Sequence, residues 1–323
     1  MEFSHKSVLA QECMEGLRIR PQGIYMDATT GGGGHSLGIV QRLGEGGRLI
    51  CIDRDDDALR AAGKRLEPYR DKITFVKSNF SDIAAVAKDL GISQVDGILF
   101  DLGVSSYQLD AMERGFSYMN DAPLDMRMDR SQSFTAGDVV NGYSQEELKR
   151  ILWDYGEERY SGRIAAAICR RREEKPIQST VELAEIIRGA MPPQALREKQ
   201  HPAKRSFQAI RIAVNDELGS VSRMLQQAIP RLRPGGRLAV ISFHSLEDRI
   251  VKSELAAAAK GCVCPPSFPV CVCGRQPQVR LVSRKPILPS QREIDENPRA
   301  RSAKLRLAEK LDQPQGNQPD EVE

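Results

Sequence analysis

Long apolar runs are missing from this 323-residue chain. Charged residues interrupt every apolar stretch before it reaches the roughly 20 residues that a membrane helix needs. The first residues, Met1 to Lys6, lack the charged-then-apolar layout of a secretory signal. With a mean hydropathy of −0.42 and 28% charged residues, the composition is typical of a globular protein. We therefore expect a cytoplasmic protein that has no membrane partner.

Aromatic residues and cysteines are also scarce. At 5% of the chain, the aromatics are too few for an extended platform on which single-stranded bases stack. Seven cysteines in a chain of this length do not suggest a disulfide scaffold. Four of them form two C-x-C pairs, Cys262 with Cys264 and Cys271 with Cys273. These pairs are compatible with a tetrahedral zinc site or with reduced loop thiols, and the sequence leaves both open. In either case, we expect no metal ion to take part in the reaction.

The charges are distributed unevenly along the chain. The net charge is +3, but residues 1–110 carry 13 basic and 16 acidic residues, whereas the remainder carries 34 and 28. A basic later part is typical of a chain that meets a polyanion, although solvated helix faces rich in arginine give the same balance. Residues 170–172, 199–205 and 274–310 are the basic segments that fit phosphate contacts.

The first third of the chain alternates between short apolar runs and helical spacing. Apolar runs followed by helices of about ten residues predict right-handed crossovers and a parallel, doubly wound α/β sheet. The predicted strands cover residues 23–29, 47–53, 72–76 and 95–101, and the predicted helices cover 36–43, 55–66 and 81–90.

This alternation stops at Asp110 and resumes after Arg205. Residues 110–205 contain helical stretches and polar turns but no apolar strand, which predicts an inserted, mostly helical domain. Apolar residues at three- and four-residue steps then predict one amphipathic helix over 207–229. The sheet domain would comprise residues 1–109 and 206–310, and residues 311–323 would form a disordered acidic tail. Later elements are a turn at 233–236, strands at 237–243, 278–287 and 302–308, and a helix at 246–259.

A glycine-rich turn and a strand-end acid indicate a cofactor site. Four glycines, residues 31–34, follow the first predicted strand, and such a turn lets the backbone approach a ligand closely. Asp53 ends the second strand, where a carboxylate can accept both hydroxyl protons of a ribose. Together they predict a cofactor that contains adenosine.

The turn is similar to the D-x-G-x-G-x-G loop of class I methyltransferases. It opens with Asp27 and departs from that pattern at Thr29, which replaces the first glycine. Phe80 follows the third strand and can cover the face of an adenine ring. S-adenosylmethionine is accordingly the expected cofactor.

Asp101 ends the fourth predicted strand, where amino-group methyltransferases carry an acid or amide, two prolines and an aromatic. The prolines and the aromatic are absent here, so Asp101 is either the acceptor of a proton from the target amine or only a cofactor ligand. Tyr107, Phe116 and Tyr118 follow and are candidates to sandwich an extruded base. Methylation at cytosine C5 is excluded, because the chain has no Pro-Cys pair to supply the nucleophile.

Five separate motifs carry a more specific resemblance. In order along the chain, they resemble the bacterial ribosomal RNA small subunit methyltransferase H family, also called MraW. The similarity extends from His5 to Lys310. The motifs are residues 30–36 (TGGGGHS), 101–106 (DLGVSS), 123–129 (PLDMRMD), 242–248 (SFHSLED) and 297–302 (NPRARS).

The resemblance implies N4-methylation of a cytidine in the decoding region of 16S ribosomal RNA, with S-adenosylmethionine as methyl donor and the small ribosomal subunit as substrate. It also implies a class I methyltransferase sheet interrupted by a helical domain that recognises RNA. The oligomeric state is not fixed, and a homodimer is one option. Carried over by position, the cofactor site would comprise Gly33, Gly34, His35, Asp53, Phe80, Asp101 and Gln108. Asp101 is also the candidate catalytic residue because it ends the fourth predicted strand, and its two possible roles stay open.

Two other functions fit the same sheet. A nucleotide-binding RNA module without catalysis would use the glycine turn only to hold its ligand. An NAD-dependent oxidoreductase would bind a dinucleotide there, although the turn lacks the G-x-G-x-x-G spacing that such enzymes favour.

Overall fold

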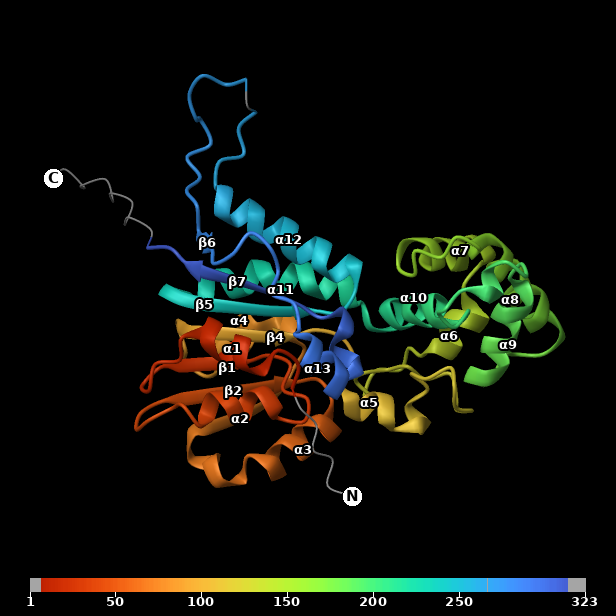
Figure 1. The fold of residues 1–323 in the computed structure, drawn as a ribbon, viewed down its shortest axis with the longest axis horizontal. Helices are drawn as coiled ribbons and strands as arrows, with labels where there is room; N and C mark the ends of the chain where they lie inside the picture. Colours follow the sequence, from red (N-terminus) through yellow and green to blue (C-terminus); the bar gives the residue numbers. More distant parts are fainter. Residues whose placement is uncertain (1–6, 266, 313–323) are drawn as a thin grey trace. The chain divides into compact units, whose positions relative to one another are not determined.

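The computed structural model describes residues 7–265 and 267–312 (Figure 1). The predicted tail lies outside the described residues from 313 onward. Among the described residues, no helix is both long and apolar enough to cross a membrane. The strands are β1 (Ile24–Asp27), β2 (Arg48–Asp53), β3 (Ile73–Lys77), β4 (Val95–Asp101), β5 (Leu232–Ser242), β6 (Val279–Leu281) and β7 (Lys304–Lys310).

Helices separate these strands and also form a block of their own. In chain order they are α1 (Ala10–Leu17), α2 (Gly34–Val40), α3 (Asp56–Arg65), α4 (Ile83–Asp89), α5 (Ser106–Asp110), α6 (Ala136–Gly142), α7 (Gln145–Asp154), α8 (Ser161–Glu174), α9 (Thr180–Ala190), α10 (Lys204–Asn215), α11 (Glu217–Arg231), α12 (Ser245–Lys260) and α13 (Gln291–Glu296). Short 3₁₀ turns include η2 (Phe80–Asp82) and η3 (Met112–Arg114).

The strands form one sheet in the order β3-β2-β1-β4-β5-β7-β6 within the described residues. Strands β1 to β5 pair in parallel, whereas β7 is antiparallel to both β5 and β6. The predicted fold class, a class I methyltransferase sheet with an inserted, mostly helical segment, is confirmed. The strand predicted at 302–308 is present as β7, but its antiparallel direction was not predicted, because apolar patterning does not give strand direction.

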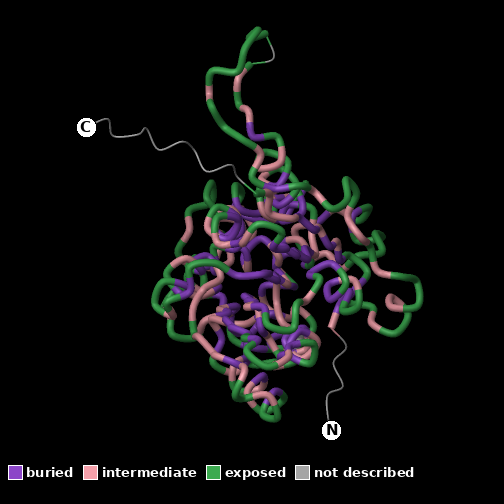
Figure 2. The backbone as a smooth tube through the Cα atoms, turned by 90° about the vertical axis from the view of Figure 1, so that its left-hand side faces the viewer, coloured by how far each residue is buried: buried purple, intermediate pink, exposed green. Residues whose placement is uncertain are grey.

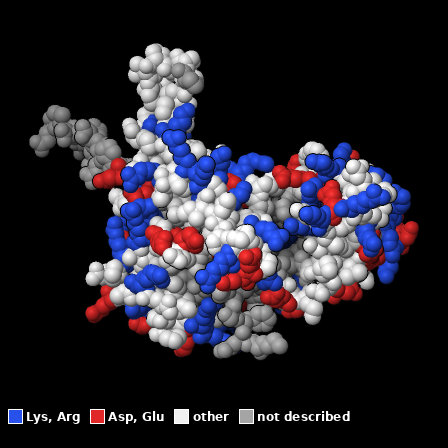
Figure 3. All heavy atoms as spheres, in the orientation of Figure 1, with Lys and Arg blue, Asp and Glu red and all other residues white. Residues whose placement is uncertain are grey.

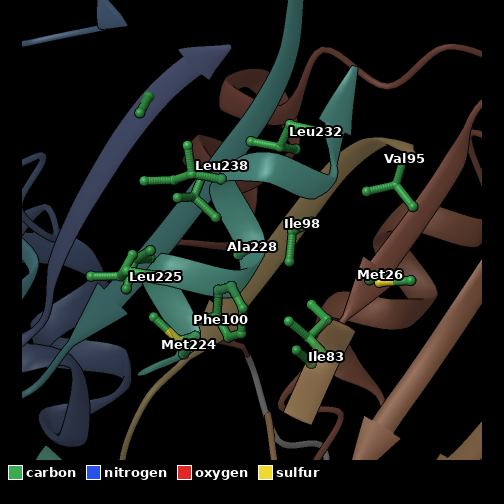
Figure 4. Close-up of a cluster of buried hydrophobic side chains, with 14 of the residues drawn as sticks. Met26, Ile83, Val95, Ile98, Phe100, Met224, Leu225, Ala228, Leu232 and Leu238 are labelled. Atoms are coloured by element: carbon green, nitrogen blue, oxygen red, sulfur yellow. The ribbon is translucent and has the colours of Figure 1, made fainter. Parts of the chain in front are cut away.

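The central strands β1, β2 and β4 are mostly buried on both faces of the sheet, which explains why their sequences are largely apolar. Side chains alternate between faces: Met26, Ile98 and Phe100 pack with residues of α4, α11 and α12 (Figure 4). Tyr25 and Leu99 lie on the other face with residues of α1, α2 and α3. At Gly16 in α1, an added Cβ would lie 2.6 Å from the Leu307 side chain, so the helix sits close against β7.

The chain divides into two compact units. The sheet unit comprises the described residues of Met1–Asp53, Asp57–Leu102 and Ser220–Glu323, and the helical unit comprises Arg54–Asp56 and Gly103–Gly219. The sequence-based boundaries at residues 110 and 205 thus differ from the structural ones. Residues 206–215 pack into the core of the helical unit, which also contains α6 to α9.

The prediction of one continuous helix over residues 207–229 is wrong. The structure has two helices, because Asp216 adopts a left-handed backbone (φ 44°) that ends α10 before α11 begins. The apolar stripe continues across the break, so periodicity alone did not reveal it. Likewise, the turn predicted at 233–236 does not separate two elements. These residues lie within β5, where the pairing of β5 with β4 is locally irregular. Helix α1 was not predicted.

Candidate functional site

The candidate site lies at the carboxyl ends of β1, β2 and β4 in the sheet unit. Parallel strands bring their carboxyl ends to one edge of the sheet, so acids that end neighbouring strands come together there. Asp27 ends β1, Asp53 ends β2 and Asp101 ends β4. The glycine turn joins β1 to α2 and crosses the same edge.

Hydrogen bonds to neighbouring strands fix the glycine turn. The Thr30 backbone N–H donates to Ile52 O at 3.0 Å, and its hydroxyl donates to Ile52 O at 3.1 Å. Gly33 has φ 75°, a left-handed conformation that favours glycine, and an added Cβ would lie 3.2 Å from Ala62. Both backbone angle and space therefore require glycine at position 33.

Asp53 is joined directly to this turn. Its Oδ2 accepts the backbone N–H of Gly31 at 2.8 Å. The side chain is half-buried, which leaves it accessible to a ligand at the end of β2. Asp53 thus orders the turn from the neighbouring strand, a contact that the sequence did not reveal.

His35 and Asp101 form a pair at the edge of the sheet. His35 Nε2 lies 3.4 Å from Asp101 Oδ2, and the imidazole is 6% exposed. Burial favours the neutral imidazole, but the Asp101 carboxylate, with Asp27 and Glu293, outweighs it and holds the pKa of His35 above its ordinary value. His35 Nδ1 and Asp101 Oδ1 are buried and have no hydrogen-bond partner among the described residues. Buried polar atoms without partners at a strand end are available to a ligand.

Asp27, expected from the sequence only to open the loop, ends β1 at the same edge of the sheet. It is fully buried, and its Oδ2 accepts the Ser36 hydroxyl at 2.6 Å. Burial raises its pKa, against the effect of the Ser36 hydrogen bond. Next to it, Thr29 Oγ1 accepts the Asp101 backbone N–H at 2.5 Å. Thr29, the departure from the usual glycine pattern, therefore ties the turn to the end of β4.

Phe80 lies at the start of η2, directly after β3. Its ring packs edge-on against Phe100, with centroids 6.1 Å apart, and the residue is half-buried. The Asn79 side chain accepts the backbone N–H of Ser81 and so fixes the turn that carries Phe80. A partly exposed aromatic side chain thus lies just beyond the end of β3, the strand that neighbours β2 in the sheet.

Gln108 belongs to the helical unit, in contrast to the other predicted site residues. Its Nε2 donates to Asp55 Oδ2 at 2.8 Å, and its Oε1 accepts the Ser105 backbone N–H at 3.1 Å. The side chain is 4% exposed. These contacts give Gln108 a structural role as the cap of α5, and its role as a cofactor ligand stays a prediction.

The three aromatic candidates differ in accessibility. Tyr107 is 48% exposed, whereas Phe116 is buried beside Arg114. Tyr118 is already stacked on His201, with ring centroids 4.3 Å apart. Tyr107 is therefore the best of the three for contact with a base.

Two of the sequence motifs are explained by local structure. In residues 242–248, Glu247 accepts the backbone N–H groups of Phe243 and His244, which caps α12. The next residue, Asp248, pairs with Arg306 at 2.6 Å and with Lys304 at 3.2 Å, both on β7. This motif therefore anchors α12 to the antiparallel strand.

The motif at 123–129 has a similar role in the helical unit. Arg127 forms a two-pronged contact with Asp125, with distances of 2.9 Å and 2.7 Å. Asn215 accepts the backbone N–H of Met128 and donates to Met126 O, both at 2.8 Å. The motif thus holds an irregular segment, in which Met126 has φ 55°, against the end of α10.

The pairing of His35 with Asp101 predicts a pH effect. A pKa raised by folding stabilises the protein below the unfolded histidine pKa of about 6.5, and this stabilisation is lost as the pH rises through the folded pKa. In urea unfolding followed by circular dichroism, the stability difference between wild type and His35→Gln should shrink as the pH rises above about 6.5. When both proteins also carry Asp101→Asn, this dependence of the stability difference on pH should weaken. A stability difference between wild type and His35→Gln that grows as the pH rises would contradict the pairing.

Comparison with known proteins identifies the family of this chain. The model of the MraW methylase family matches residues 2–311. The chain belongs to the MraW methylase family. Ribosomal RNA small subunit methyltransferase H of Brevibacillus brevis is 56% identical over 311 residues, which cover 96% of this chain and 99% of that protein. The protein of the same name from Heliobacterium modesticaldum is 54% identical over 96% of this chain and 100% of its own length.

Solved structures were compared as well. A putative rRNA methylase from Clostridium thermocellum aligns with a TM-score of 0.44 at 14% identity, covering 96% of this chain and 100% of that one. An rRNA methylase from Streptococcus thermophilus aligns with a TM-score of 0.41 at 11% identity, over 94% of each chain. Membership of the MraW methylase family and the sheet topology establish a methyltransferase whose methyl donor is S-adenosylmethionine.

Proposed function

We propose that this protein methylates N4 of a cytidine in the decoding region of 16S ribosomal RNA, within the small ribosomal subunit. Membership of the MraW methylase family and relatives named ribosomal RNA small subunit methyltransferase H support an action on 16S ribosomal RNA. The observation that carries the chemistry is the buried Oδ1 of Asp101 at the end of β4, which has no hydrogen-bond partner among residues 7–265 and 267–312. An acceptor in that position suits an exocyclic amine, which must lose a proton when it is methylated.

The groups at the sheet edge fit S-adenosylmethionine. Asp53 would accept the ribose hydroxyls, and the half-buried face of Phe80 would cover the adenine. Gly33 and Gly34 would let the backbone approach the ligand. His35 would use its backbone N–H or its Nδ1, which has no hydrogen-bond partner in the described part of the chain. When bound, the cofactor supplies the methyl group as an electrophilic sulfonium.

Asp101 has the central part in the proposed chemistry. The N4 lone pair of cytosine is delocalised into the ring, so the amine is a weak nucleophile. A hydrogen bond from the amine to Asp101 Oδ1 would localise the lone pair, and the carboxylate would take the proton as the methyl is transferred. His35, through its ion pair with Oδ2, would hold the carboxylate in place. Methyl transfer is a direct displacement, so placing the amine in line with the methyl group would lower the remaining activation barrier.

We further propose that the helical unit recognises RNA. Of the basic run at 170–172, Arg171 pairs with Glu174 and Glu182, and Arg172 donates to Val140 O. Only Arg170 of this run is fully exposed, so the run offers less to phosphates than the sequence suggested. Lys199 and Lys204 are exposed and are the better candidates in this unit.

Substitution of Asp53 tests the cofactor assignment. Asp53→Ala would remove two charge-assisted hydrogen bonds to the ribose, worth ~1.5–3 kcal/mol each, and would release the Gly31 N–H. We expect the affinity for S-adenosylmethionine, measured by calorimetry, to fall at least about tenfold. Asp71→Ala, a change at an exposed acid before β3, should leave the affinity unchanged. Unchanged affinity in a folded Asp53→Ala variant would refute the assignment.

The proposed reaction is tested by mapping methylated nucleosides. In 16S ribosomal RNA from cells lacking this protein, mass spectrometry should show the loss of one N4-methylcytidine methyl group in the decoding region. The purified protein should restore it on small subunits from those cells. A methyl group lost from another atom or another region would overturn the proposal.

A further inference from the structure

A loop with four cysteines lies between α12 and β6. In Figure 2 this loop, residues 261–278, extends away from the sheet unit, and most of its described residues are exposed. The sequence has no charged residue from Gly261 to Gly274, and the outer part of the loop is correspondingly uncharged in Figure 3. Val270 and Val272 are 70% and 73% exposed. The loop therefore has no apolar core to hold it in one conformation.

The four thiols nevertheless converge. Cys262 Sγ lies 3.5 Å from Cys271 Sγ and 3.8 Å from Cys273 Sγ. Cys271 Sγ lies 3.5 Å from Cys273 Sγ and 4.0 Å from Cys264 Sγ, and all four sulfur atoms lie within 4.8 Å of one another. Tetrahedral zinc with Zn–S bonds of about 2.3 Å places its sulfur ligands about 3.8 Å apart. Disulfides, at about 2.05 Å, are far shorter, and all four cysteines are free.

We propose that Cys262, Cys264, Cys271 and Cys273 bind a structural zinc ion. The four thiolates supply a closed Cys₄ set, with no position left for water or substrate, so the metal would hold the loop and take no part in methyl transfer. Zinc suits this site because soft thiolates in a tetrahedral arrangement select it over magnesium or calcium.

Backbone contacts around the sulfurs support this proposal. The Val272 N–H donates to Cys264 Sγ at 3.4 Å, a contact between the two C-x-C pairs. Such bonds offset the charge that thiolates bring to a metal and orient them toward it. Lys260 and Arg275, which flank the uncharged stretch, are exposed cations next to a cluster that is negative when zinc is bound.

The base of the loop is closed by backbone contacts. The Gln278 N–H donates to Ala258 O at 2.8 Å. Gly261 has φ 70°, and an added Cβ there would overlap the backbone of Gln276 and Pro277. The two ends of the loop are therefore held together at the sheet unit. Beyond this point, the metal would join the two C-x-C pairs and reinforce the hydrogen bond from the Val272 N–H to Cys264 Sγ.

Metal analysis of the full-length protein tests the proposal. Protein purified under reducing conditions with added zinc should contain about one zinc per chain by elemental analysis. Cobalt in place of zinc should give the charge-transfer and d–d absorption bands of tetrahedral cobalt thiolate. Cys264→Ser and Cys271→Ser should each lower the zinc content at least about fivefold, whereas Cys169→Ser, in α8, should leave it unchanged.

A second measurement does not depend on the metal content alone. Chelation should speed tryptic cleavage after Arg275 at least about tenfold, because the loop loses its cross-link. The circular dichroism spectrum should stay unchanged, since the sheet unit keeps its fold. Wild-type protein without zinc, zinc that remains in the Cys264→Ser and Cys271→Ser variants, iron in place of zinc, or cleavage unaffected by chelation would each overturn the proposal.

Discussion

Asp101→Asn should lower the rate of methyl transfer about 100-fold or more, with the affinity for S-adenosylmethionine nearly intact. Asparagine keeps the size of the side chain and one acceptor oxygen but cannot take the amine proton. The Asp101 backbone N–H would still donate to Thr29, so the end of β4 should keep its shape. The measurement is a single-turnover rate at saturating cofactor, on small subunits that lack the modification.

The outcome distinguishes the two roles that the sequence left open for Asp101. If the side chain only holds the cofactor, affinity should fall and the rate at saturating cofactor should recover. A rate within about threefold of wild type would rule out Asp101 as the proton acceptor. Asp89→Asn, at an exposed position in α4, makes the same chemical change away from the sheet edge and should leave both quantities unchanged.

Arg114→Met should destabilise the helical unit by about 3–5 kcal/mol. The Arg114 side chain is 1% exposed and lies 2.9 Å from Asp55, which is 2% exposed. It also donates to Arg127 O and Met128 O, so it supports the segment that carries the motif at 123–129. Methionine of similar volume would leave the Asp55 carboxylate buried without its cation, and removal of one partner of a buried pair is costly.

The single tryptophan, Trp153 in α7, allows this unit to be followed by itself. Its fluorescence in urea should report the lower stability of Arg114→Met. Addition of Asp55→Asn should recover part of the loss, because the double variant no longer buries a carboxylate that has lost the Arg114 cation. If Arg114→Met lowers the free energy of unfolding by less than about 1 kcal/mol, the ion pair of Arg114 with Asp55 is not needed for folding.

The sequence predicted the sheet well because its signals are local. Buried parallel strands appear as short apolar runs, and the predicted runs coincide closely with β1 to β4. The predictions for the late strands were less accurate. Residues 278–287 contain only the three-residue β6, and the strand predicted at 302–308 is observed two residues later, as β7 (Lys304–Lys310). Edge strands and antiparallel strands give weaker apolar patterns in the sequence, because fewer of their residues are buried than in a central parallel strand, which is covered on both faces.

The acids at the strand ends were identified for the same reason. Asp53 and Asp101 each follow an apolar run, so position along the chain was enough to place them at one edge of the sheet. Asp27 was visible in the same pattern but was not chosen, because nothing local reveals that its partner is Ser36. Gln108 was carried over by resemblance, and its contacts with Asp55 and Ser105 emerged only from the folded chain.

Local pattern by itself determined the alternating sheet, the inserted helical segment and the chemistry available at the glycine turn. Tertiary structure decided which groups meet: His35 with Asp101, Asp53 with Gly31, and the four sulfurs of the loop. It also decided that the apolar stripe over 207–229 is divided into two helices, since the left-handed backbone of Asp216 ends α10, and that the units divide after Gly219. The physical reason is that hydrophobic period reports which side of an element is buried, whereas contacts between distant residues depend on strand register and loop closure.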